Sequence, residues 1–242
     1  MNIKRLVPDG ITACNLLCGA VAVLLAVEGA FLYAFLLILL GAFFDFFDGM
    51  SARLLKVPSA MGIQMDSLAD DITFGLAPAM MLCSYLRPLI GWWCLLALLM
   101  AAASARRLAK FNIDKRQTSS FIGLATPANA IFWGSLCCMP YAMMAAPWLP
   151  WLLVGLSLFS CYLLNAEIPF FSFKFHGFSW KEHLPQYLFL IGAVVILAFC
   201  IVKACLHQYF LLAVFGGAAC IVWYVLINLL WNITSAPKDA NR

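Results

Sequence analysis

The stretch from Asp45 to Asp71 reads DFFDGMSARLLKVPSAMGIQMDSLADD and holds five of the eleven acidic residues in the chain. Two of them, Asp45 and Asp48, end one hydrophobic run, whereas Asp66 and Asp70 open the next. Spacings of three and four residues place each pair on one face of a helix. An aspartate at the centre of a bilayer costs about 2.5–3.5 kcal/mol on insertion scales, so acidic groups within membrane helices are functional candidates by default.

The rest of the chain is as apolar as the flanks of this stretch. Of 242 residues, 65% are hydrophobic and 11% are charged, whereas soluble domains are near half apolar and a quarter charged. With a mean hydropathy of +0.95, the composition excludes an ordinary soluble globule and a disordered chain. The net charge of +4 is too small for the basic footprint of a nucleic-acid-binding protein. The ten cysteines are scattered and are interpreted as packing residues.

Eight apolar runs follow one another along the chain, separated by turn residues and charges. They cover residues 11–28, 30–50, 66–86, 89–112, 126–144, 147–169, 186–205 and 208–232. A membrane helix needs about 20 apolar residues, so eight spans use about 160 residues and leave about 80 for all loops and tails. We therefore predict an all-α integral membrane protein, a polytopic bundle of about eight transmembrane helices in one membrane-embedded domain over residues 1–242. The first run is interpreted as a retained helix, not as a cleaved signal peptide.

The distribution of Lys and Arg predicts the orientation of these spans. With the N-terminus inside, all but two of the fifteen basic residues fall on the inner side. They are Lys4, Arg5, Arg53, Lys56, Arg106, Arg107, Lys110, Lys115, Arg116, Lys174, Lys181, Lys238 and Arg242. Arg87 and Lys203 fall on the outer side. We therefore expect both termini and the acidic segment on the cytoplasmic side, and the expected location is the inner (plasma) membrane of a bacterium.

This topology brings the two carboxylate pairs together. The second span runs inward and the third outward, so both pairs lie at one depth near the cytoplasmic side. Four carboxylates in one place repel each other, and divalent cations compensate such a charge. An all-oxygen ligand set suits Mg²⁺, Mn²⁺ or Ca²⁺, and two ions would balance four negative charges, as in sites for phosphoryl-type displacement. Gly49 and Ala52 follow Asp45 and Asp48 at helical spacing, and Gly62 precedes Asp66 by four residues. These small residues leave room for a ligand.

The acidic segment has two other interpretations besides a metal site, namely solvated charges at helix ends and a cation transporter. Isolated acidic residues at helix ends are usually solvated, but four at this spacing on adjacent helices are not typical of solvated charges. A divalent-cation transporter also uses intramembrane acids. That alternative does not explain the small residues beside the acids or Arg53, nor the placement of all four acids at one edge instead of along a pore.

The spacing D-x2-D-G-x2-A-R-x8-G-x3-D-x3-D resembles the signature of the CDP-alcohol phosphotransferase family. It is met here without departure by Asp45, Asp48, Gly49, Ala52, Arg53, Gly62, Asp66 and Asp70. The resemblance implies an integral membrane enzyme with a six-helix core, to which residues 186–232 would add two C-terminal helices. Such an enzyme transfers a substituted phosphoryl group from a CDP-linked donor to an alcohol and releases CMP.

Further stretches resemble the phosphatidylserine synthases within that family. They are MDSLADDITFGLAPA (65–79), RLAKFN (107–112), FIGLATPANA (121–130) and IPFFSFK (168–174). The sequence departs from the family pattern at three positions. Lys110 replaces an arginine and Ala125 a proline, and Asp9, in VPDGIT (7–12) near the N-terminus, replaces an asparagine. The resemblance implies CDP-diacylglycerol as donor, L-serine as acceptor and phosphatidylserine as product. Glycerol 3-phosphate or inositol is the alternative acceptor, and a divalent-cation transporter is the alternative from a different class.

The family resemblance also implies a role for each signature residue. A divalent metal, Mg²⁺ or Mn²⁺ and two ions in number, would be held by Asp45, Asp48, Asp66 and Asp70. Asp70 would in addition be the catalytic base that takes the proton from the serine hydroxyl. The CDP donor is expected to bind at Asp48, Gly49, Ala52, Arg53, Gly62 and Asp66. There the small residues would let the cytidine approach the helix, and Arg53 would pair with a phosphate.

Two basic residues at the cytoplasmic end of the fourth span, Arg107 and Lys110, are candidates for binding the serine carboxylate or the donor phosphates. Asp71 adjoins Asp70 but points about 100° away on an ideal helix, so it is left out of the metal site. Family analogy implies a homodimer, and the other partners expected are the two substrates and membrane lipids. The segment 170–183 is expected to lie along the headgroup region.

Overall fold

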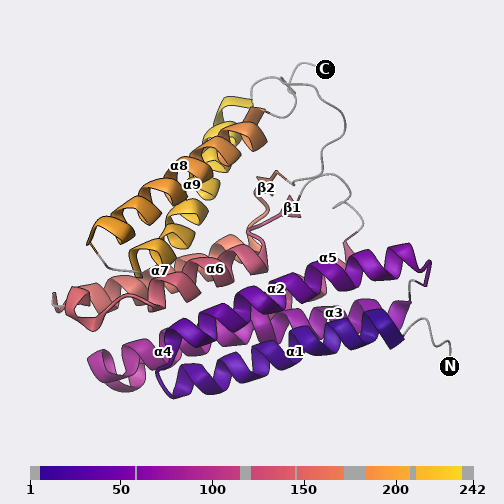
Figure 1. Cartoon of the computed structure of the whole chain (residues 1–242), viewed down its shortest axis with the longest axis horizontal. Coiled ribbons are helices and arrows are strands. Elements are labelled where there is room, and N and C mark those ends of the chain that lie inside the picture. The colour runs from indigo at the N-terminus through magenta and orange to yellow at the C-terminus, as the bar shows by residue number, and fades with distance from the viewer. Residues whose placement is uncertain are drawn as a thin grey trace.

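The protein is almost entirely helical in the computed structural model, which describes residues 6–57, 59–114, 121–144, 146–171, 184–207 and 211–235 (Figure 1). The α-helices are α1 (Leu6–Val27), α2 (Phe31–Leu54), α3 (Ala60–Asp70), α4 (Ala77–Ile90), α5 (Leu99–Ile113), α6 (Thr126–Cys137), α7 (Leu149–Asn165), α8 (Leu184–His207) and α9 (Leu211–Ser235). A π-helical turn, η2 (Asp71–Leu76), joins α3 to α4, and 3-10 helices form η3 (Gly91–Leu98) and η4 (Tyr141–Met144). Two strands of two residues each, β1 (Phe121–Ile122) and β2 (Pro169–Phe170), pair antiparallel. The predicted all-α membrane fold is confirmed.

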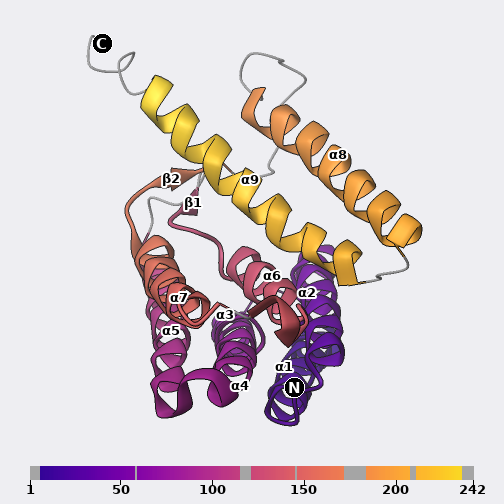
Figure 2. The same ribbon diagram turned by 90° about the vertical axis from the view of Figure 1, so that its left-hand side faces the viewer.

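Helices α1 to α7 run side by side as a bundle, and the hairpin of α8 and α9 leans away from it (Figures 1 and 2). Within the described residues, five helical runs are long and apolar enough to cross a membrane. They are Leu6–Val27, Phe31–Leu54, Ala60–Ile113, Leu184–Leu206 and Val214–Ile233. The run Ala60–Ile113 folds back at Gly91, whose φ of 60° lies in the left-handed region that favours glycine. This one run therefore supplies the third and fourth of the predicted spans.

Several helix ends differ from the predicted ones for local reasons. The third span begins six residues early, at Ala60, because the Ser59 hydroxyl accepts a hydrogen bond from Gly62 N at 2.9 Å and caps the helix. The break predicted at Arg87-Pro88 lies at Gly91 instead, since Pro88 is accommodated in the last turn of α4. The fifth span ends at Cys137, earlier than the predicted residue 144.

Small residues let the π-helical turn η2 lie directly against α1 and α2. A Cβ atom on Gly19 would lie 2.7 Å from Thr73 Cα, and one on Gly41 would lie 2.5 Å from Thr73 Cγ2. The Thr73 hydroxyl donates to the backbone carbonyl of Asn15 at 2.9 Å. This close packing holds Asp70, the last residue of α3, against the middle of α1.

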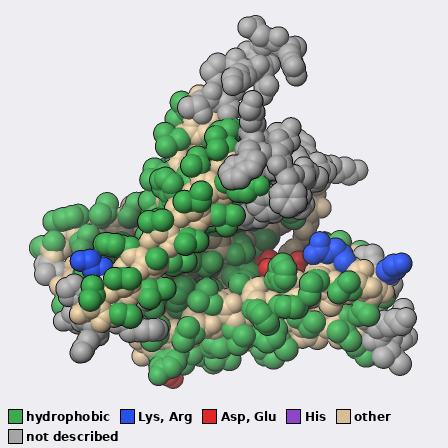
Figure 3. All heavy atoms as spheres, turned by 45° about the horizontal axis from the view of Figure 1, so that its top comes forward, with side chains coloured by type: hydrophobic (Ala, Val, Ile, Leu, Met, Phe, Trp, Pro, Cys, Tyr) green, Lys and Arg blue, Asp and Glu red, His purple; other side chains and the backbone are tan. Residues whose placement is uncertain are grey.

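Charged side chains gather at one end of the bundle, whereas apolar side chains cover most of the face seen in Figure 3. Among the described residues, Arg53, Lys56, Arg106, Arg107 and Lys110 lie at the end where α2 stops and α3 begins, and Arg87 and Lys203 lie at the opposite end. The other basic residues of the predicted inner side, namely Lys4, Arg5, Lys115, Arg116, Lys174, Lys181, Lys238 and Arg242, lie outside the described residues, as does 172–183 of the predicted headgroup segment.

Candidate functional site

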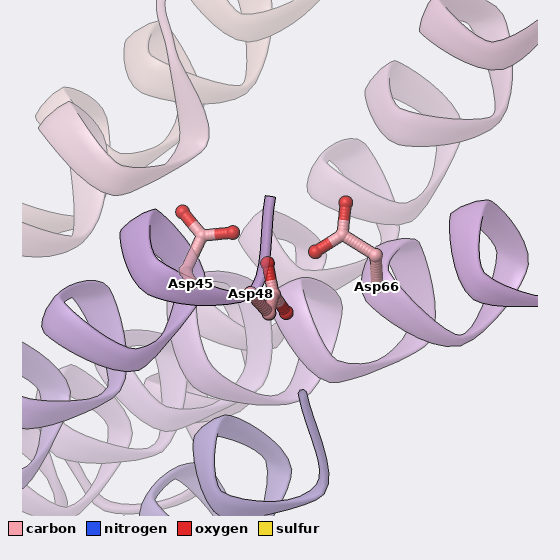
Figure 4. A group of neighbouring side chains, drawn as sticks. All are labelled: Asp45, Asp48 and Asp66. Atoms are coloured by element: carbon pink, nitrogen blue, oxygen red, sulfur yellow. The ribbon is translucent and has the colours of Figure 1, made fainter. Parts of the chain in front are cut away.

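Three of the signature carboxylates converge between α2 and α3. Asp45 and Asp48 extend from α2 and Asp66 from α3, and one carboxylate oxygen of each lies within 4.8 Å of the other two. Figure 4 shows the carboxylates of Asp45 and Asp66 turned toward one another, with Asp48 between them. The arrangement follows from the spacing: one turn of α2 separates the first two residues, and the tight turn after Leu54 brings α3 back alongside.

Asp48 is held in place by a residue of α1. The Thr12 hydroxyl donates to Asp48 Oδ2 at 2.6 Å, and the Pro8 carbonyl lies 3.0 Å from the same hydroxyl. The side chain of Asp48 is only 5% exposed, so a hydroxyl donor satisfies an oxygen that water reaches poorly. Thr12 therefore fixes the direction in which Asp48 offers its other oxygen.

Asp70 lies one turn beyond Asp66 on α3 and is bound by a second residue of α1. Asn15 is fully buried, and its Nδ2 donates to Asp70 Oδ1 at 3.1 Å. Asp45 is within hydrogen-bonding distance of both Asp66 and Asp70. The structure thus brings all four signature aspartates into one group, in which Asp70 is the member bound by Asn15.

Asp71 points elsewhere, as its place on the helix predicts. Its Oδ1 lies 2.5 Å from the position that a Cβ on Gly75 would occupy, and Ser104 Oγ lies 2.6 Å from the same position. Asp71 therefore packs with Ser104 of α5 at the glycine in the π-helical turn, on a different side from the four-aspartate group.

An open cavity of about 140 Å³ adjoins the carboxylates at the charged end of the bundle. It is lined by Pro8, Asp9, Thr12, Asp48, Gly49, Ala52, Val57, Ser59, Gly62, Ile63 and Asp66. A Cβ on Gly49 would meet nothing within 4 Å, whereas one on Gly62 would lie 3.1 Å from Ser59 Oγ and 3.9 Å from Asp9 Oδ1. Gly49 therefore borders free space. At Gly62 the cavity is narrow, and a larger side chain there would contact Ser59.

Two of the predicted basic residues are engaged away from the carboxylates. Arg53 is exposed, and its Nε donates to the backbone carbonyl of Gly49 at 2.9 Å, within its own helix. Lys110 forms an ion pair with Glu167, with 3.1 Å between Nζ and Oε1. The structure does not bring either cation into contact with the aspartates.

Arg107 is placed differently, because it is buried at 8% exposure and lies within electrostatic reach of Asp70. Its Nη1 lies 3.5 Å from Thr126 Oγ1, a long hydrogen bond, and its Nε has no hydrogen-bond partner among the described residues. A buried guanidinium with an unused donor is expensive unless an anion or a polar ligand completes it. Of the predicted basic residues in the described chain, Arg107 is therefore the one poised to bind an anion beside the site.

The contribution of α1 to the site was not predicted from the sequence. Thr12 and Asn15 orient two of the four aspartates, and Asp9 and Ser59 line the cavity. One signal was present in the sequence: Asn15 is an amide within an apolar run of membrane-spanning length, where polar side chains are candidates for a functional role. Its partner, 55 residues away, could not be found from spacing.

The donor set fits a divalent cation. The carboxylate oxygens of Asp45, Asp48 and Asp66 are hard ligands close enough to share one ion. Asp66 Oδ1 is buried and has no hydrogen-bond partner among the described residues, so a ligand is needed to satisfy it. Mutually facing carboxylates in partly buried surroundings also need a compensating positive charge.

Comparison with known proteins agrees with this geometry. Several relatives bear the name CDP-diacylglycerol–serine O-phosphatidyltransferase. That of Bacillus subtilis (strain 168) is 38% identical over 174 residues, covering 71% of this chain and 93% of that protein. That of Mycobacterium tuberculosis (strain ATCC 25618 / H37Rv) is 30% identical over 246 residues, covering 97% and 79%. That of Helicobacter pylori (strain ATCC 700392 / 26695) is 35% identical over 134 residues, covering 54% and 56%.

The family model matches the part of the chain that holds the site. The model of the CDP-alcohol phosphatidyltransferase family matches residues 5–160. This range contains every signature aspartate, the cavity beside them, and the α1 residues that orient them. It ends before α8 and α9. The chain belongs to the CDP-alcohol phosphatidyltransferase family.

Proposed function

We propose that this protein transfers the phosphatidyl group of CDP-diacylglycerol to the hydroxyl group of L-serine, giving phosphatidylserine and CMP. The observation that carries the proposal is the convergence of Asp45, Asp48 and Asp66 at a cavity lined by the small residues of the family signature. The names of the relatives support serine as the acceptor. The predicted orientation supports a site on the cytoplasmic face of a bacterial inner membrane, and membership of the family supports a homodimer.

The four aspartates would hold Mg²⁺ or Mn²⁺, with two ions matching their charge. When bound, divalent ions would neutralise the diphosphate of the donor and so lower the repulsion that an attacking oxygen meets. Asp48 enters this arrangement already oriented by Thr12, and Asp66 offers the buried oxygen that lacks another partner. The chain itself therefore supplies the ligands, their orientation and partly buried surroundings.

The cavity beside the carboxylates would receive the cytidine end of the donor. Free space at Gly49 admits a flat ring close to the helix backbone, and the other cavity-lining members of the signature, Asp48, Ala52, Gly62 and Asp66, would surround it. Arg53 lies at the edge of this region, with its Nε on the Gly49 carbonyl. To pair with a donor phosphate, Arg53 would have to exchange that backbone contact for the phosphate oxygen.

Asp70 would act as the general base. Asn15 occupies its Oδ1, which leaves Oδ2 as the atom that would accept the proton of the serine hydroxyl. The hydroxyl oxygen would then attack the phosphorus on the lipid side of the diphosphate, forming the new ester bond. The bond to the CMP oxygen breaks, and CMP leaves with that electron pair.

Arg107 would bind the carboxylate of serine. It is buried, lies near Asp70 and has an unused Nε donor, so a carboxylate bound there would bring the serine hydroxyl toward the base. An acceptor with a phosphate, such as glycerol 3-phosphate, would need more positive charge. Lys110 is already paired with Glu167, which favours the smaller charge of a carboxylate and makes Lys110 the weaker candidate.

A purified-enzyme assay tests the proposal. The protein in detergent micelles is given CDP-diacylglycerol, Mg²⁺ or Mn²⁺, and in turn L-serine, glycerol 3-phosphate and inositol, and CMP release is measured. We expect CMP release with serine and its loss on chelation of the metal. Release with another alcohol and not with serine would overturn the serine assignment. No release with any alcohol, together with Mn²⁺ flux in proteoliposomes, would favour the transporter.

A further inference from the structure

Helix α9 carries a line of polar side chains on an otherwise apolar sequence. Tyr224, Asn228 and Asn232 follow one another at intervals of four residues, so they lie on one face of the helix. The matched family range ends at residue 160, so this polar line belongs to a part of the chain that the signature does not explain. Intramembrane amides and hydroxyls are costly unless they make hydrogen bonds, so their partners indicate what the helix does.

All three side chains bind the backbone of one short segment, residues 169–171. Asn228 Oδ1 accepts from Phe171 N at 2.8 Å, and Tyr224 Oη donates to Phe171 O at 3.1 Å. Asn232 Nδ2 donates to Pro169 O at 2.8 Å. Asn228 is 3% exposed, and its Nδ2 donates to Tyr224 O at 2.8 Å, so the amide is fixed in rotation. Figure 2 shows α9 passing beside β2.

This segment is tied in turn to the start of α6 and the end of α7. Its strand β2 pairs with β1, and Gly123 N donates to Ile168 O at 2.9 Å. Gly123 has a φ of 79°, and a Cβ there would lie 2.6 Å from Leu164 O, so the two connections approach as closely as glycine allows. We call the paired strands β1 and β2 the β1–β2 junction. A buried apolar cluster lies around it and consists of Phe170, Tyr224, Leu124 and Leu163.

Residues in and next to the β1–β2 junction also lie beside Arg107, the buried cation of the site. A small cavity beside Arg107 and Lys110 is lined by Ile122, Leu164, Asn165 and Ala166, which lie within or next to the strand pair. Tyr224 also lies within electrostatic reach of Arg107. A chain of contacts therefore runs from α9 through β2 and β1 to Arg107, the residue proposed to bind the serine carboxylate.

Helix α9 also has contacts with the bundle and with α8 that do not involve the polar line. One lies toward the other end of the helix, where a Cβ on Gly217 would lie 3.4 Å from Ile131 Cγ2 and from Ser135 Oγ. The hairpin with α8 has its own contact, since Trp223 Nε1 donates to Leu188 O at 3.3 Å. Three hydrogen bonds of the polar line join it to the connecting segment 169–171.

We propose that Tyr224, Asn228 and Asn232 are positioning residues for the acceptor. They fix the β1–β2 junction against Arg107, so that the C-terminal hairpin sets the affinity for serine without touching the substrate. The inference rests on the proposed function, because it takes Arg107 as the acceptor-binding cation. It gives α9 a part in acceptor binding, while the donor cavity lies at α1, α2 and α3.

Steady-state kinetics of the full-length protein test the proposal. In Asn228→Leu and Tyr224→Phe, we expect the KM for serine to rise about tenfold, with the KM for CDP-diacylglycerol unchanged. The matched control is Trp223→Phe, which removes a hydrogen bond of the same helix that does not reach the junction. An unchanged KM for serine in the Asn228 and Tyr224 variants, an equal rise for both substrates, or the same rise in Trp223→Phe would overturn the proposal.

Hydrogen exchange supplies a readout that does not depend on turnover. The peptide containing Phe171 should exchange faster in Asn228→Leu than in wild type, and at the wild-type rate in Trp223→Phe. Unchanged exchange in Asn228→Leu would remove the link between α9 and the junction. If the wild-type protein uses another alcohol in place of serine, the serine assignment fails, and the same variants are judged by the KM for that alcohol.

Discussion

At the scale of single residues, α1 supplies different hydrogen-bond donors to two of the four aspartates. Thr12 binds Asp48 and Asn15 binds Asp70, so the two partners lie one helical turn apart and serve different members of the group. The spacing of the signature predicts which acids share a helix face, but not which of them α1 binds. Those hydrogen bonds depend on how closely α1 approaches, a tertiary contact that no local pattern encodes.

Removing the Asn15 side chain should slow the chemical step. In Asn15→Ala, Asp70 loses the donor that fixes its Oδ1, and a hydrogen bond to a charged group contributes about 1.5–3 kcal/mol, or roughly a ten- to hundredfold change in kcat. We expect the KM values for both substrates to stay near wild type. The matched control is Thr73→Val, which loses a hydrogen bond to the Asn15 backbone and leaves the Asn15–Asp70 contact in place. An equal loss of kcat in the control would assign Asn15 to packing.

The aspartates themselves should divide into two kinds. Asp70→Asn should lower kcat by at least about a hundredfold, because an amide cannot accept the serine proton, while donor binding persists. Asp66→Asn should instead raise the Mn²⁺ concentration needed for half-maximal rate, since it changes the oxygen that lacks a protein partner. Metal titrations of CMP release separate the two effects. Near-normal turnover by Asp70→Asn would remove it as the base.

The sequence could not predict which of the basic residues binds an anion, because that depends on the direction of each side chain. Arg53 follows Gly49 by one helical turn, and the structure uses that proximity for a hydrogen bond to the Gly49 carbonyl. Lys110 and Arg107 are one turn apart as well, yet one meets Glu167 at the surface and the other is buried near Asp70. Spacing predicted that these residues lie near the site, and only their surroundings show which is free to bind an anion.

At the scale of elements, hydrophobic periodicity predicted the helices well, and it could not predict how the third span is built. The sequence from Asp71 to Leu76 is apolar enough to continue an ordinary helix, yet it forms a π-helical turn. Its cause lies in other helices: Gly19 and Gly41 admit Thr73, and Gly75 admits Asp71 and Ser104. Such turns are frequent at functional sites, and this one begins directly after Asp70.

The fit of the π-helical turn against α1 predicts a stability difference between two glycines of that helix. A Cβ on Gly19 would lie 2.7 Å from Thr73 Cα, whereas one on Gly10 would meet nothing within 4 Å. Alanine is favoured over glycine in a helix by about 1 kcal/mol, so Gly10→Ala should leave the Tm unchanged or raise it. Gly19→Ala should lower the Tm, because the backbone of η2 must move. Equal Tm values for the two variants, measured in the same detergent, would contradict this packing.

At the scale of the whole molecule, the charge asymmetry was readable from the sequence and the lean of the C-terminal hairpin was not. The described basic residues do gather at the site end, with Arg87 and Lys203 opposite. The hairpin of α8 and α9 instead takes its direction from the contacts of α9 with α6 and β2 (Figure 1). Because β1 and β2 have two residues each, their pairing leaves no periodic signal from which that contact could be predicted.

The orientation of the molecule in the membrane gives the last prediction. Glu28, in the turn after α1, and Lys56, in the turn after α2, are both exposed and lie at opposite ends of the bundle. If the basic end faces the cytoplasm, a membrane-impermeant maleimide should modify Glu28→Cys in cells with a permeabilised outer envelope, and Lys56→Cys only after the inner membrane is broken. Peptide mapping by mass spectrometry distinguishes the new thiol from the ten native cysteines. Modification of Lys56→Cys before lysis would place the aspartate cavity on the outer face. Serine of the cytoplasm and CDP-diacylglycerol of the inner leaflet could not reach the cavity there.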